Sequence, residues 1–369
     1  MRIDTIEIYR VAMPLIYPFR TAYGSDDCIE SILVRMTSGS YYGWGESSPL
    51  RAPTYSSEWA QGVFIAMRDW LAPLLVGQDI TSGEQLQRAL ASIKGNYFAK
   101  GGLDLTWWDL YARFEGRPLW KLIGGKGPDV EVGADFGVME SLDDLLVEIG
   151  KAREAGFKRT KLKFRPGWDL NMVAAVRERY PDMVIHIDCN SAYRLSDLAL
   201  FQELDRYHLA MIEQPLAHDD LVDHAKLQAN IRTPICLDES IVSVDKARKA
   251  IELRACRWIN IKPARVGGLT QALAIHDLCQ EAGIPCWIGG MLESAIGQSF
   301  NMALATLPNI RYPSDIFPSE RFYREDLGEP PITLSGPSRV TASMEPGIGC
   351  EPHPERLKRL TVERVVVRA

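Results

Sequence analysis

RTKLKF at residues 159–164 is the first of five short β-like stretches that decide the fold. The others are VIHID (184–188), AMIE (210–213), PICLD (234–238) and WINIKP (258–263). Each carries an ionisable residue at its end, and these residues lie 25, 25, 25 and 24 residues apart; they are Lys163, Asp188, Glu213, Asp238 and Lys262. The constant step predicts one repeated strand-and-helix unit whose strand always ends at the same height.

Amphipathic stretches such as SLDDLLVEIGKAREAG (141–156) separate these runs, and the alternation begins near residue 128. A strand followed by a helix occurs at least seven times in succession. This repetition predicts a parallel sheet, which is either open and doubly wound or closed as a barrel. An open sheet would spread five strand ends over roughly 20 Å, because neighbouring strands lie about 4.8 Å apart. The in-phase charges favour the closed barrel, in which all strand ends meet at one mouth.

The chain outside this rhythm predicts a second, discontinuous unit. RIDTIEIYRV (2–11), SILVRMTSG (31–39) and YYGWGESSP (41–49) are strand-like, whereas residues 56–115 have helical patterns. The last fifty residues lose the rhythm and end in the strand-like RLTVERVVVR (359–368). We therefore expect an α+β capping domain at 1–127, a barrel at 128–320, and a segment at 321–369 that packs back on the capping domain.

Composition excludes several classes of protein. The chain has 369 residues, 46% hydrophobic and 24% charged, as in an ordinary globular protein. A net charge of -6 argues against a nucleic-acid partner, and no apolar run of about 18 residues predicts a membrane span. The N-terminus lacks a signal-peptide pattern, and seven scattered cysteines without a C-x-x-C pair fit a reducing cytoplasm.

Three carboxylates on neighbouring strand ends, Asp188, Glu213 and Asp238, would repel one another unless a cation lay between them. Oxygen ligands select magnesium, manganese or calcium over zinc, and three protein ligands leave positions open for substrate oxygens. A single acid at a strand end is more simply a cap of the next helix. Three carboxylates at equivalent positions of three neighbouring strands instead predict a Mg²⁺ site, which Mn²⁺ could also occupy.

Lys161 and Lys163 are two residues apart on one strand, so both side chains point to the same face, the inside of the barrel. Lys262 lies further around the same mouth. A lysine near other cations has a lowered pKa and can act as a base. Solvated strand-end lysines are the simpler interpretation for a lone residue, but not for an inward K-x-K. Together the residues predict metal-assisted removal of a proton next to a substrate carboxylate.

The order K-x-K, D-x-N, E-Q-P, D-E-S, K-P-x-R-x-G-G resembles the muconate-lactonising branch of the enolase superfamily. Within it, the chain is most similar to the o-succinylbenzoate synthase / N-acylamino acid racemase group. PFRTAYG (18–24), GWGES (43–47), KLKFRPGWD (161–169), IEQPLAHDDLVDHAKLQ (212–228) and GGMLESAIG (289–297) carry this resemblance. It implies a capping domain and a modified (β/α)7β barrel of the TIM type.

The resemblance also implies roles for single residues. Asp188, Glu213 and Asp238 would hold Mg²⁺, and Lys163 and Lys262 would be acid/base groups on opposite faces of the substrate. Lys161 would hold the substrate carboxylate and lower the pKa of Lys163. Three further groups would orient or tune these residues: Asn190, Glu239 and Arg265.

Substrate selection would fall to the capping loops and a late strand end. The expected contacts are Phe19, Arg20 and Tyr23 in one loop, Pro53 and Tyr55 in another, and Met291, Glu293 and Ser294 after the late strand. Dipeptide epimerases carry D-x-D at that last place, so MLES argues against a dipeptide. Relatives usually have a serine or another small residue where Asp135 stands, and an extra carboxylate there could disfavour an anionic tail or pair with a lysine.

The resemblance therefore implies a small-molecule carboxylate as substrate and two candidate reactions. One is dehydration of 2-succinyl-6-hydroxy-2,4-cyclohexadiene-1-carboxylate to o-succinylbenzoate, on the menaquinone pathway. The other is racemisation of N-acylamino acids, above all N-succinyl ones, at the same two lysines. A non-catalytic metal-binding barrel is the alternative of another class. Relatives are often dimers or octamers, so the resemblance implies a homo-oligomer.

Overall fold

A parallel sheet of seven strands forms the centre of the computed structural model, which describes residues 1–368. Its strands neighbour one another in the order β11-β10-β9-β8-β7-β6-β5, so each strand pairs with the next along the chain. The strands are β5 (Ala134–Phe136), β6 (Arg159–Lys163), β7 (Val184–Asp188), β8 (Ile212–Glu213), β9 (Ile235–Leu237), β10 (Trp258–Ile261) and β11 (Cys286–Ile288). The five stretches with in-phase charges are β6 to β10, as the sequence predicts.

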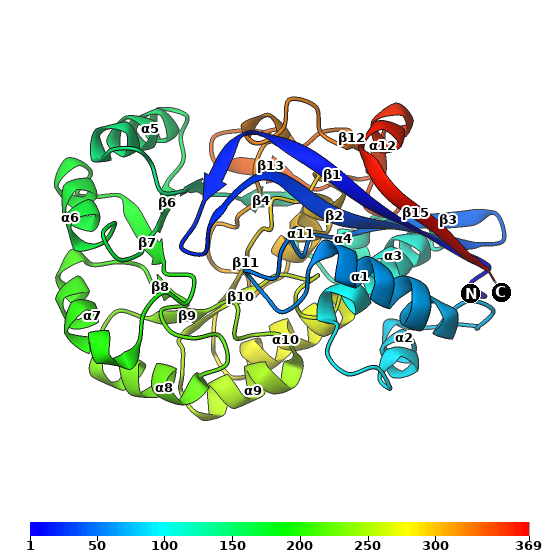
Figure 1. Cartoon of the computed structure of the whole chain (residues 1–369), viewed down its shortest axis with the longest axis horizontal. Helices are drawn as coiled ribbons and strands as arrows, with labels where there is room; N and C mark the ends of the chain where they lie inside the picture. Colours follow the sequence, from blue (N-terminus) through cyan, green and yellow to red (C-terminus); the bar gives the residue numbers. More distant parts are fainter. Residues whose placement is uncertain (369) are drawn as a thin grey trace.

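Helices cover the outside of this sheet, and all but the last of them form an arc that runs from green to yellow in Figure 1. They are α5 (Leu142–Glu154), α6 (Leu170–Arg179), α7 (Leu198–Leu204), α8 (Leu221–Asn230), α9 (Val244–Glu252), α10 (Leu269–Glu281) and α11 (Ala295–Ala305). Ser141 and Ser243 cap α5 and α9, where each side chain accepts a hydrogen bond from a free backbone N–H of the first turn. The alternation predicted from the sequence is confirmed.

Residues 310–315 close the barrel between its first and last strands. On one side Arg311 N donates to Cys286 O (2.9 Å) and Asp315 N to Ile288 O (2.8 Å). On the other side Ser314 N donates to Glu131 O (2.9 Å). This extended segment takes the eighth strand position of the barrel. Its sequence, IRYPSD, contains a proline and no alternation, so the sequence analysis did not find it.

A second sheet, antiparallel and with the order β15-β1-β2-β3, forms the capping unit. Its strands are β1 (Thr5–Arg20), β2 (Ser25–Ser38), β3 (Tyr41–Ser47) and β15 (Thr361–Arg368), and helices α1 (Ala60–Ala66), α2 (Gly83–Leu90), α3 (Tyr97–Phe114) and α4 (Leu119–Leu122) accompany them. Gly43 and Gly45 let α3 approach β3, because a Cβ at Gly43 would lie 2.3 Å from Leu110 N.

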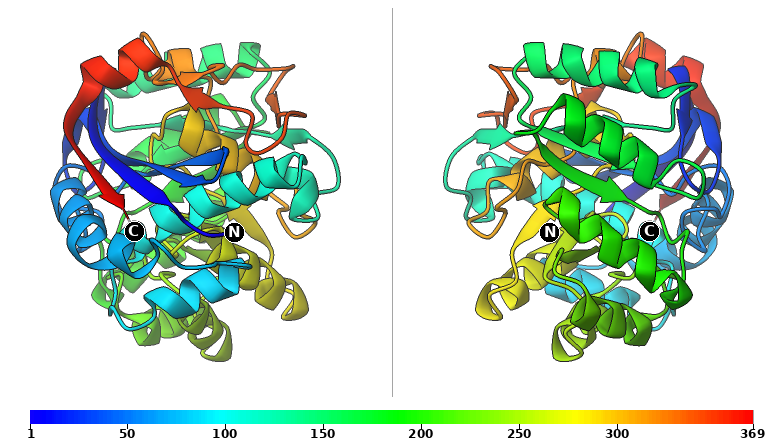
Figure 2. Two further views of the ribbon diagram at one scale, coloured as in Figure 1. Left: turned by 90° about the vertical axis from the view of Figure 1, so that its right-hand side faces the viewer. Right: turned by 90° about the vertical axis from the view of Figure 1, so that its left-hand side faces the viewer.

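The C-terminal segment returns to the capping sheet, where β15 pairs with β1 from Thr5↔Arg368 onward. Both ends of the chain consequently lie at the same end of the molecule, next to each other in Figure 1 but apart in the turned views of Figure 2. Shorter elements precede β15: the pairs β4 (Asp129–Glu131) with β13 (Arg339–Thr341) and β12 (Gly328–Glu329) with β14 (Glu351–Pro352), and helix α12 (Pro354–Leu360). The domain limits at residues 127 and 320 stay predictions.

The helices and the cysteines of residues 1–368 bear on what the composition predicted about membrane spans and thiols. Within this range, no helix combines the length and apolar character that crossing a bilayer requires. All seven cysteines lie in this range and are free thiols; Cys28 is half-buried and the other six are buried.

Glu46 joins the capping unit to the barrel. This β3 carboxylate is 1% exposed and accepts hydrogen bonds from Ser294 N (3.1 Å), Ser294 Oγ (2.5 Å) and Gly297 N (2.9 Å) at the start of α11. A carboxylate favours a helix N-terminus because unpaired N–H groups point at it. Burial nevertheless raises the pKa of Glu46 to about 7, against the opposing effect of these donors.

We predict that the burial of Glu46 makes stability fall as the pH rises from about 4.5 to about 7. The folded chain retains the Glu46 proton in this window whereas the unfolded chain has lost it, so unfolding becomes easier by roughly 3 kcal/mol across the window. Urea unfolding at pH 5 and pH 7 should show this fall in the wild type. Buried Asp104 and Glu239, whose pKa values are raised to about 6 and about 7, contribute to the same fall. Glu46→Gln should make the fall smaller by up to roughly 3 kcal/mol, and an equally steep fall in that variant would contradict the assignment.

Candidate active site

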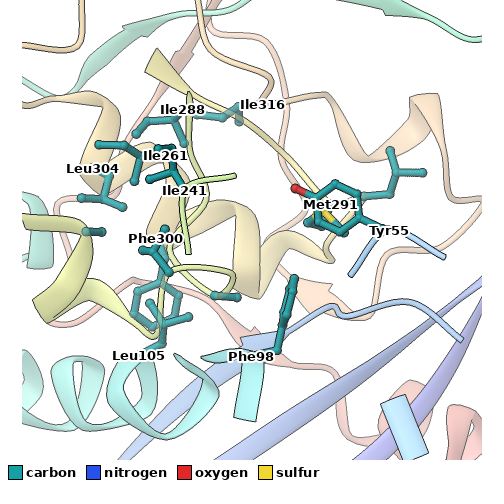
Figure 3. Close-up of a cluster of buried hydrophobic side chains, with 14 of the residues drawn as sticks. Tyr55, Phe98, Leu105, Ile241, Ile261, Ile288, Met291, Phe300, Leu304 and Ile316 are labelled. Atoms are coloured by element: carbon teal, nitrogen blue, oxygen red, sulfur yellow. The ribbon is translucent and has the colours of Figure 1, made fainter. Parts of the chain in front are cut away.

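A cavity of about 40 Å³ lies at the mouth of the barrel, beneath the capping loops. The predicted site residues that line it are Lys161, Lys163, Lys262, Asn190, Asp135, Phe19, Tyr23, Tyr55 and Met291. Figure 3 draws Tyr55 and Met291 at the edge of the buried hydrophobic cluster. A space of this size holds about one water molecule, so substrate entry requires the loops to move.

Lys161 and Lys163 compensate the first two carboxylates. Lys161 Nζ lies 3.1 Å from Asp188 Oδ2 and 2.8 Å from Glu213 Oε2, and Lys163 Nζ lies 2.7 Å from Asp188 Oδ2. All four side chains are buried, because β6, β7 and β8 are neighbours whose ends face the inside of the barrel. Such buried pairs are stable only while each charge keeps its partner.

Asp238, at the end of β9, has a different set of partners. Lys262 Nζ lies 2.9 Å from its Oδ2, Arg265 Nη1 donates to its Oδ1, and the Tyr55 hydroxyl donates to Oδ2 at 3.0 Å. Tyr55 also accepts hydrogen bonds from Lys262 (3.0 Å) and Arg265 (2.9 Å). A residue of the capping unit therefore belongs to the charged centre itself.

Lys163 and Lys262 lie on opposite sides of the mouth. β6 and β10 are four positions apart in a barrel of seven strands and one closing segment. Asp188, Glu213 and Asp238 occupy the ends of the three strands between them. This placement agrees with two proton-transfer groups on either side of a bound carbon atom.

The carboxylates are paired with these cations rather than gathered around one point. Among residues 1–368, no three histidine, cysteine, aspartate or glutamate side chains stand close enough together to ligate one ion. The donor set still fits a hard cation. Glu213 Oε2 is buried without a hydrogen-bond partner, although Lys161 lies beside it, while Oε1 accepts from Asn260 Nδ2 at 2.7 Å. Oxygen ligands on three adjacent strands suit Mg²⁺ or Mn²⁺.

Asn190 and Glu239 hold the loops that follow the strands. Asn190 N donates to Asp188 Oδ1 (3.1 Å), and Asn190 Nδ2 donates to Glu239 Oε1 (3.1 Å). Asn190 and Gln214 both have positive φ angles, of 43° and 37°, shortly after Asp188 and Glu213. Non-glycine residues rarely adopt this conformation, and such strain gathers at functional sites.

The pKa values follow this network. Burial opposes ionisation of Asp188, but Lys161 and Lys163 hold the pKa of Asp188 well below its usual range. Burial and Lys161 lower the pKa of Lys163, as expected, whereas Asp188 raises it, and the net shift is upward. The expected lowering of the Lys163 pKa by Lys161 is therefore outweighed here, because a carboxylate lies closer.

Asp315 is a charged site residue that the sequence analysis missed. It lies on the closing segment, where its Oδ1 accepts from Arg159 Nη2 (2.7 Å) and its Oδ2 from Lys161 Nζ (3.2 Å). It also lines the cavity. Its position outside the 25-residue rhythm hid it, and only the recognition of a strand at 310–315 would have placed it at the mouth.

Glu293 and Ser294 do not line the cavity, which corrects their predicted substrate contact. Glu293 accepts from Met291 N (2.9 Å) and Gln298 Nε2 (3.0 Å), so it holds the loop before α11. Ser294 caps α11 and binds Glu46. Because this stretch follows a barrel strand, the sequence predicted that it contacts the substrate. The Glu293 carboxylate and the Ser294 hydroxyl instead accept hydrogen bonds from backbone N–H groups.

Asp135, the middle residue of β5, lines the cavity; it is 6% exposed, and its Oδ1 lacks a hydrogen-bond partner. Among the described residues no cation lies within ion-pair distance of its carboxylate, so the expected alternative of a lysine partner is wrong. Burial raises the pKa of Asp135, while Lys163 and Lys161 act in the opposite direction.

Comparisons with known proteins agree with this geometry. Residues 144–356 match the family described as "Enolase C-terminal domain-like", and residues 3–124 match "Mandelate racemase / muconate lactonizing enzyme, N-terminal domain". The chain belongs to the enolase superfamily. Its fold is thus the modified TIM barrel with a capping domain that the sequence predicts.

Relatives within the superfamily are close and full-length. The chain is 43% identical over 89% of its length to N-succinylamino acid racemase of Thermus thermophilus, covering 89% of that protein. It is 42% identical over 97% of its length to o-succinylbenzoate synthase of Bacillus subtilis, covering 96% of that protein. A solved superfamily member from Listeria innocua has a TM-score of 0.96 at 35% identity, over 100% and 99% of the chains. The chain is an enzyme of this superfamily.

We predict that Arg265 is essential for stability. Its guanidinium is 1% exposed and also donates to Ile241 O (3.0 Å) and Asn260 O (2.7 Å), so it is not a surface arginine. Arg265→Met should lower the free energy of unfolding by about 3–5 kcal/mol, since it leaves Asp238 and two carbonyls short of donors. Chemical unfolding measures this loss. Arg248→Met, which removes an exposed arginine paired with Asp245, should change stability by less than about 0.5 kcal/mol.

Proposed function

We propose that the enzyme is an o-succinylbenzoate synthase. The reaction would dehydrate 2-succinyl-6-hydroxy-2,4-cyclohexadiene-1-carboxylate. The observation that carries this proposal is the pair of buried lysines on opposite sides of three carboxylates, within a chain 42% identical to the B. subtilis synthase.

Mg²⁺ is the cofactor that we assign to Asp188, Glu213 and Asp238. The unpartnered Glu213 Oε2 and the all-oxygen donor set support this assignment. When bound, Mg²⁺ supplies positive charge beside the substrate carboxylate and so favours the enediolate form over the acid. Asn260 and Asn190 would then fix the orientation of the carboxylates that they contact.

Lys163 would act as the base. Its Nζ takes the proton from C1, next to the carboxylate, and the electron pair left behind gives the enediolate. When the C1–C6 double bond forms, the hydroxyl on C6 leaves as water with the proton that Lys163 took from C1, and the ring becomes aromatic. Lys262 stays protonated on the opposite face and stabilises the negative charge, while Lys161 holds the carboxylate in place.

Racemisation of N-succinylamino acids is the second candidate. It requires Lys163 and Lys262 to exchange roles as base and acid on opposite faces of one carbon. The placement of β6 and β10 across the barrel supports it, as does the 43% identity to the T. thermophilus racemase. Both reactions begin with the same proton removal, so one centre can perform both.

We assign the enzyme to the cytoplasm, where seven free thiols would stay reduced. A homo-oligomer, either dimer or octamer, stays a prediction.

We predict rapid, magnesium-dependent loss of the ultraviolet absorbance of the cyclohexadiene-carboxylate. Lys163→Ala should slow this loss by about 10²- to 10⁴-fold, because it removes the base. Lys158→Ala, which removes an exposed lysine just before β6, is the matched control and should keep the wild-type rate.

No absorbance loss from folded, magnesium-loaded enzyme would refute the synthase. Exchange of the α-proton of an N-succinylamino acid in D₂O, followed by proton nuclear magnetic resonance, would then test the racemase.

We predict a calorimetrically detectable Mg²⁺ site that needs Glu213. Glu213→Gln should weaken Mg²⁺ binding more than Asn260→Ala, which removes only an outer partner and should cost about 10- to 100-fold. Glu252→Gln, an exposed acid on α9, should leave the affinity unchanged. Equal Mg²⁺ affinities in the wild type and Glu213→Gln would place the metal elsewhere.

A further inference from the structure

A larger hollow of about 580 Å³ lies beside the catalytic cavity. We call it the side hollow; it is bounded by residues 17–20 at the tip of β1, residues 135–139 from β5 onward, helix α5 and Arg321. Phe19 and Asp135 line both the side hollow and the catalytic cavity, so the two spaces adjoin. None of the lysines or carboxylates assigned to proton transfer or metal binding lines the side hollow.

Three cations line the side hollow, and two of them are neutralised. Arg20 pairs with Glu140, and Lys151 pairs with Glu148 at 2.6 Å. Arg321 differs: among residues 1–368, no carboxylate lies within 4.0 Å of its guanidinium. Its Nη2 donates to the main-chain oxygen of Asp135, and its Nε is buried without a partner.

Aromatic rings surround the Arg321 guanidinium. Its Cζ lies 5.3 Å from the ring centre of Phe136, 5.6 Å from that of Phe317 and 5.7 Å from that of Phe322. Rings attract a cation but replace only part of its hydration. An anion with two oxygens would supply the missing charge and accept the free N–H groups.

We infer that Arg321 binds the terminal carboxylate of the substrate's acyl tail, and that the side hollow receives this tail. The inference rests on the proposed function, in which both candidate substrates carry a succinyl group. The reacting carbon then lies between Lys163 and Lys262, and the tail passes Asp135 into the side hollow.

Phe19 separates the two spaces. Its ring centre lies 5.8 Å from Lys163 Nζ and 5.9 Å from the ring centre of Phe322, which itself touches Arg321. A cavity of about 40 Å³ cannot hold a substrate, so Phe19 moves aside when the substrate binds and the spaces join.

The Asp135 carboxylate does not oppose this arrangement. The backbone of Asp135 lies opposite that of Lys161 in the register of β5 with β6. Side chains alternate along β5, so the Asp135 side chain points toward the lysines inside the barrel. Only its main-chain oxygen faces Arg321. The anionic tail therefore meets a cation in the side hollow, and Lys161 and Lys163 lie near the Asp135 carboxylate.

Calorimetric titration of magnesium-loaded enzyme tests the inference with two ligands of the same shape. One is o-succinylbenzoate, and the other is 2-butanoylbenzoate, which lacks the tail carboxylate. The wild type should prefer o-succinylbenzoate by about 10- to 100-fold, as expected for hydrogen bonds to a charged group. Arg321→Met should remove this preference and leave 2-butanoylbenzoate binding within threefold of wild type.

The control variants separate charge from folding. Arg324→Met removes an exposed arginine three residues away and should keep the preference. Arg321→Lys should keep part of it. Arg321→Gln can still donate to the Asp135 oxygen, so it replaces Arg321→Met if thermal unfolding shows that variant to be misfolded.

Three results would overturn the inference: no preference in the wild type, a preference that survives in Arg321→Met or Arg321→Gln, or equal weakening of both ligands. Binding does not require turnover. Lost turnover with an intact preference would refute the synthase alone, whereas intact turnover without a preference would refute the role of Arg321 alone.

Discussion

Charge compensation in a dry barrel mouth is the constraint on which the rest of the structure depends. Asp188, Glu213 and Asp238 are at most 1% exposed, so each must keep a cation within contact distance. Lys161, Lys262 and Arg265 supply these contacts from strands on either side. The charged groups meet because Lys163, Asp188, Glu213, Asp238 and Lys262 stand at equivalent strand ends, 24 or 25 positions apart.

The capping unit completes this charged centre rather than merely covering it. Tyr55 hydrogen-bonds Asp238, Lys262 and Arg265, and Phe19 covers Lys163. Glu46, far from the reacting groups, ties the same unit to the start of α11. The cap is also anchored to α10, where Thr270 N and Oγ1 donate to Asp104 of α3. These anchors lie away from the loops that contact the cavity, an arrangement that allows local loop movement without separation of the two units.

The sequence predicted those parts of the site that obey a period. The step from Lys163 to Lys262 placed five groups at one mouth, because a βα unit of constant length returns each strand to the same height. Asp315 and Arg321 follow the last repeat, where prolines interrupt the pattern, so only the closed barrel brings them near the cavity. Ser294 shows the opposite error. A hydroxyl that follows a barrel strand was expected to contact the substrate, but it caps helix α11. The sequence alone does not show which backbone N–H group such a hydroxyl will bind.

Arg321 does not decide which of the two reactions the enzyme performs. A succinyl carboxylate is common to the synthase substrate and to N-succinylamino acids, so a cation that binds it cannot favour one over the other. The choice must therefore depend on groups around the rest of the substrate. Asp135 and Met291 line the catalytic cavity, and Met291 Sδ lies 3.6 Å from Lys262 Nζ. Because racemisation alone needs Lys262 to transfer a proton, side chains that restrict the Lys262 ammonium group should affect racemisation more than dehydration.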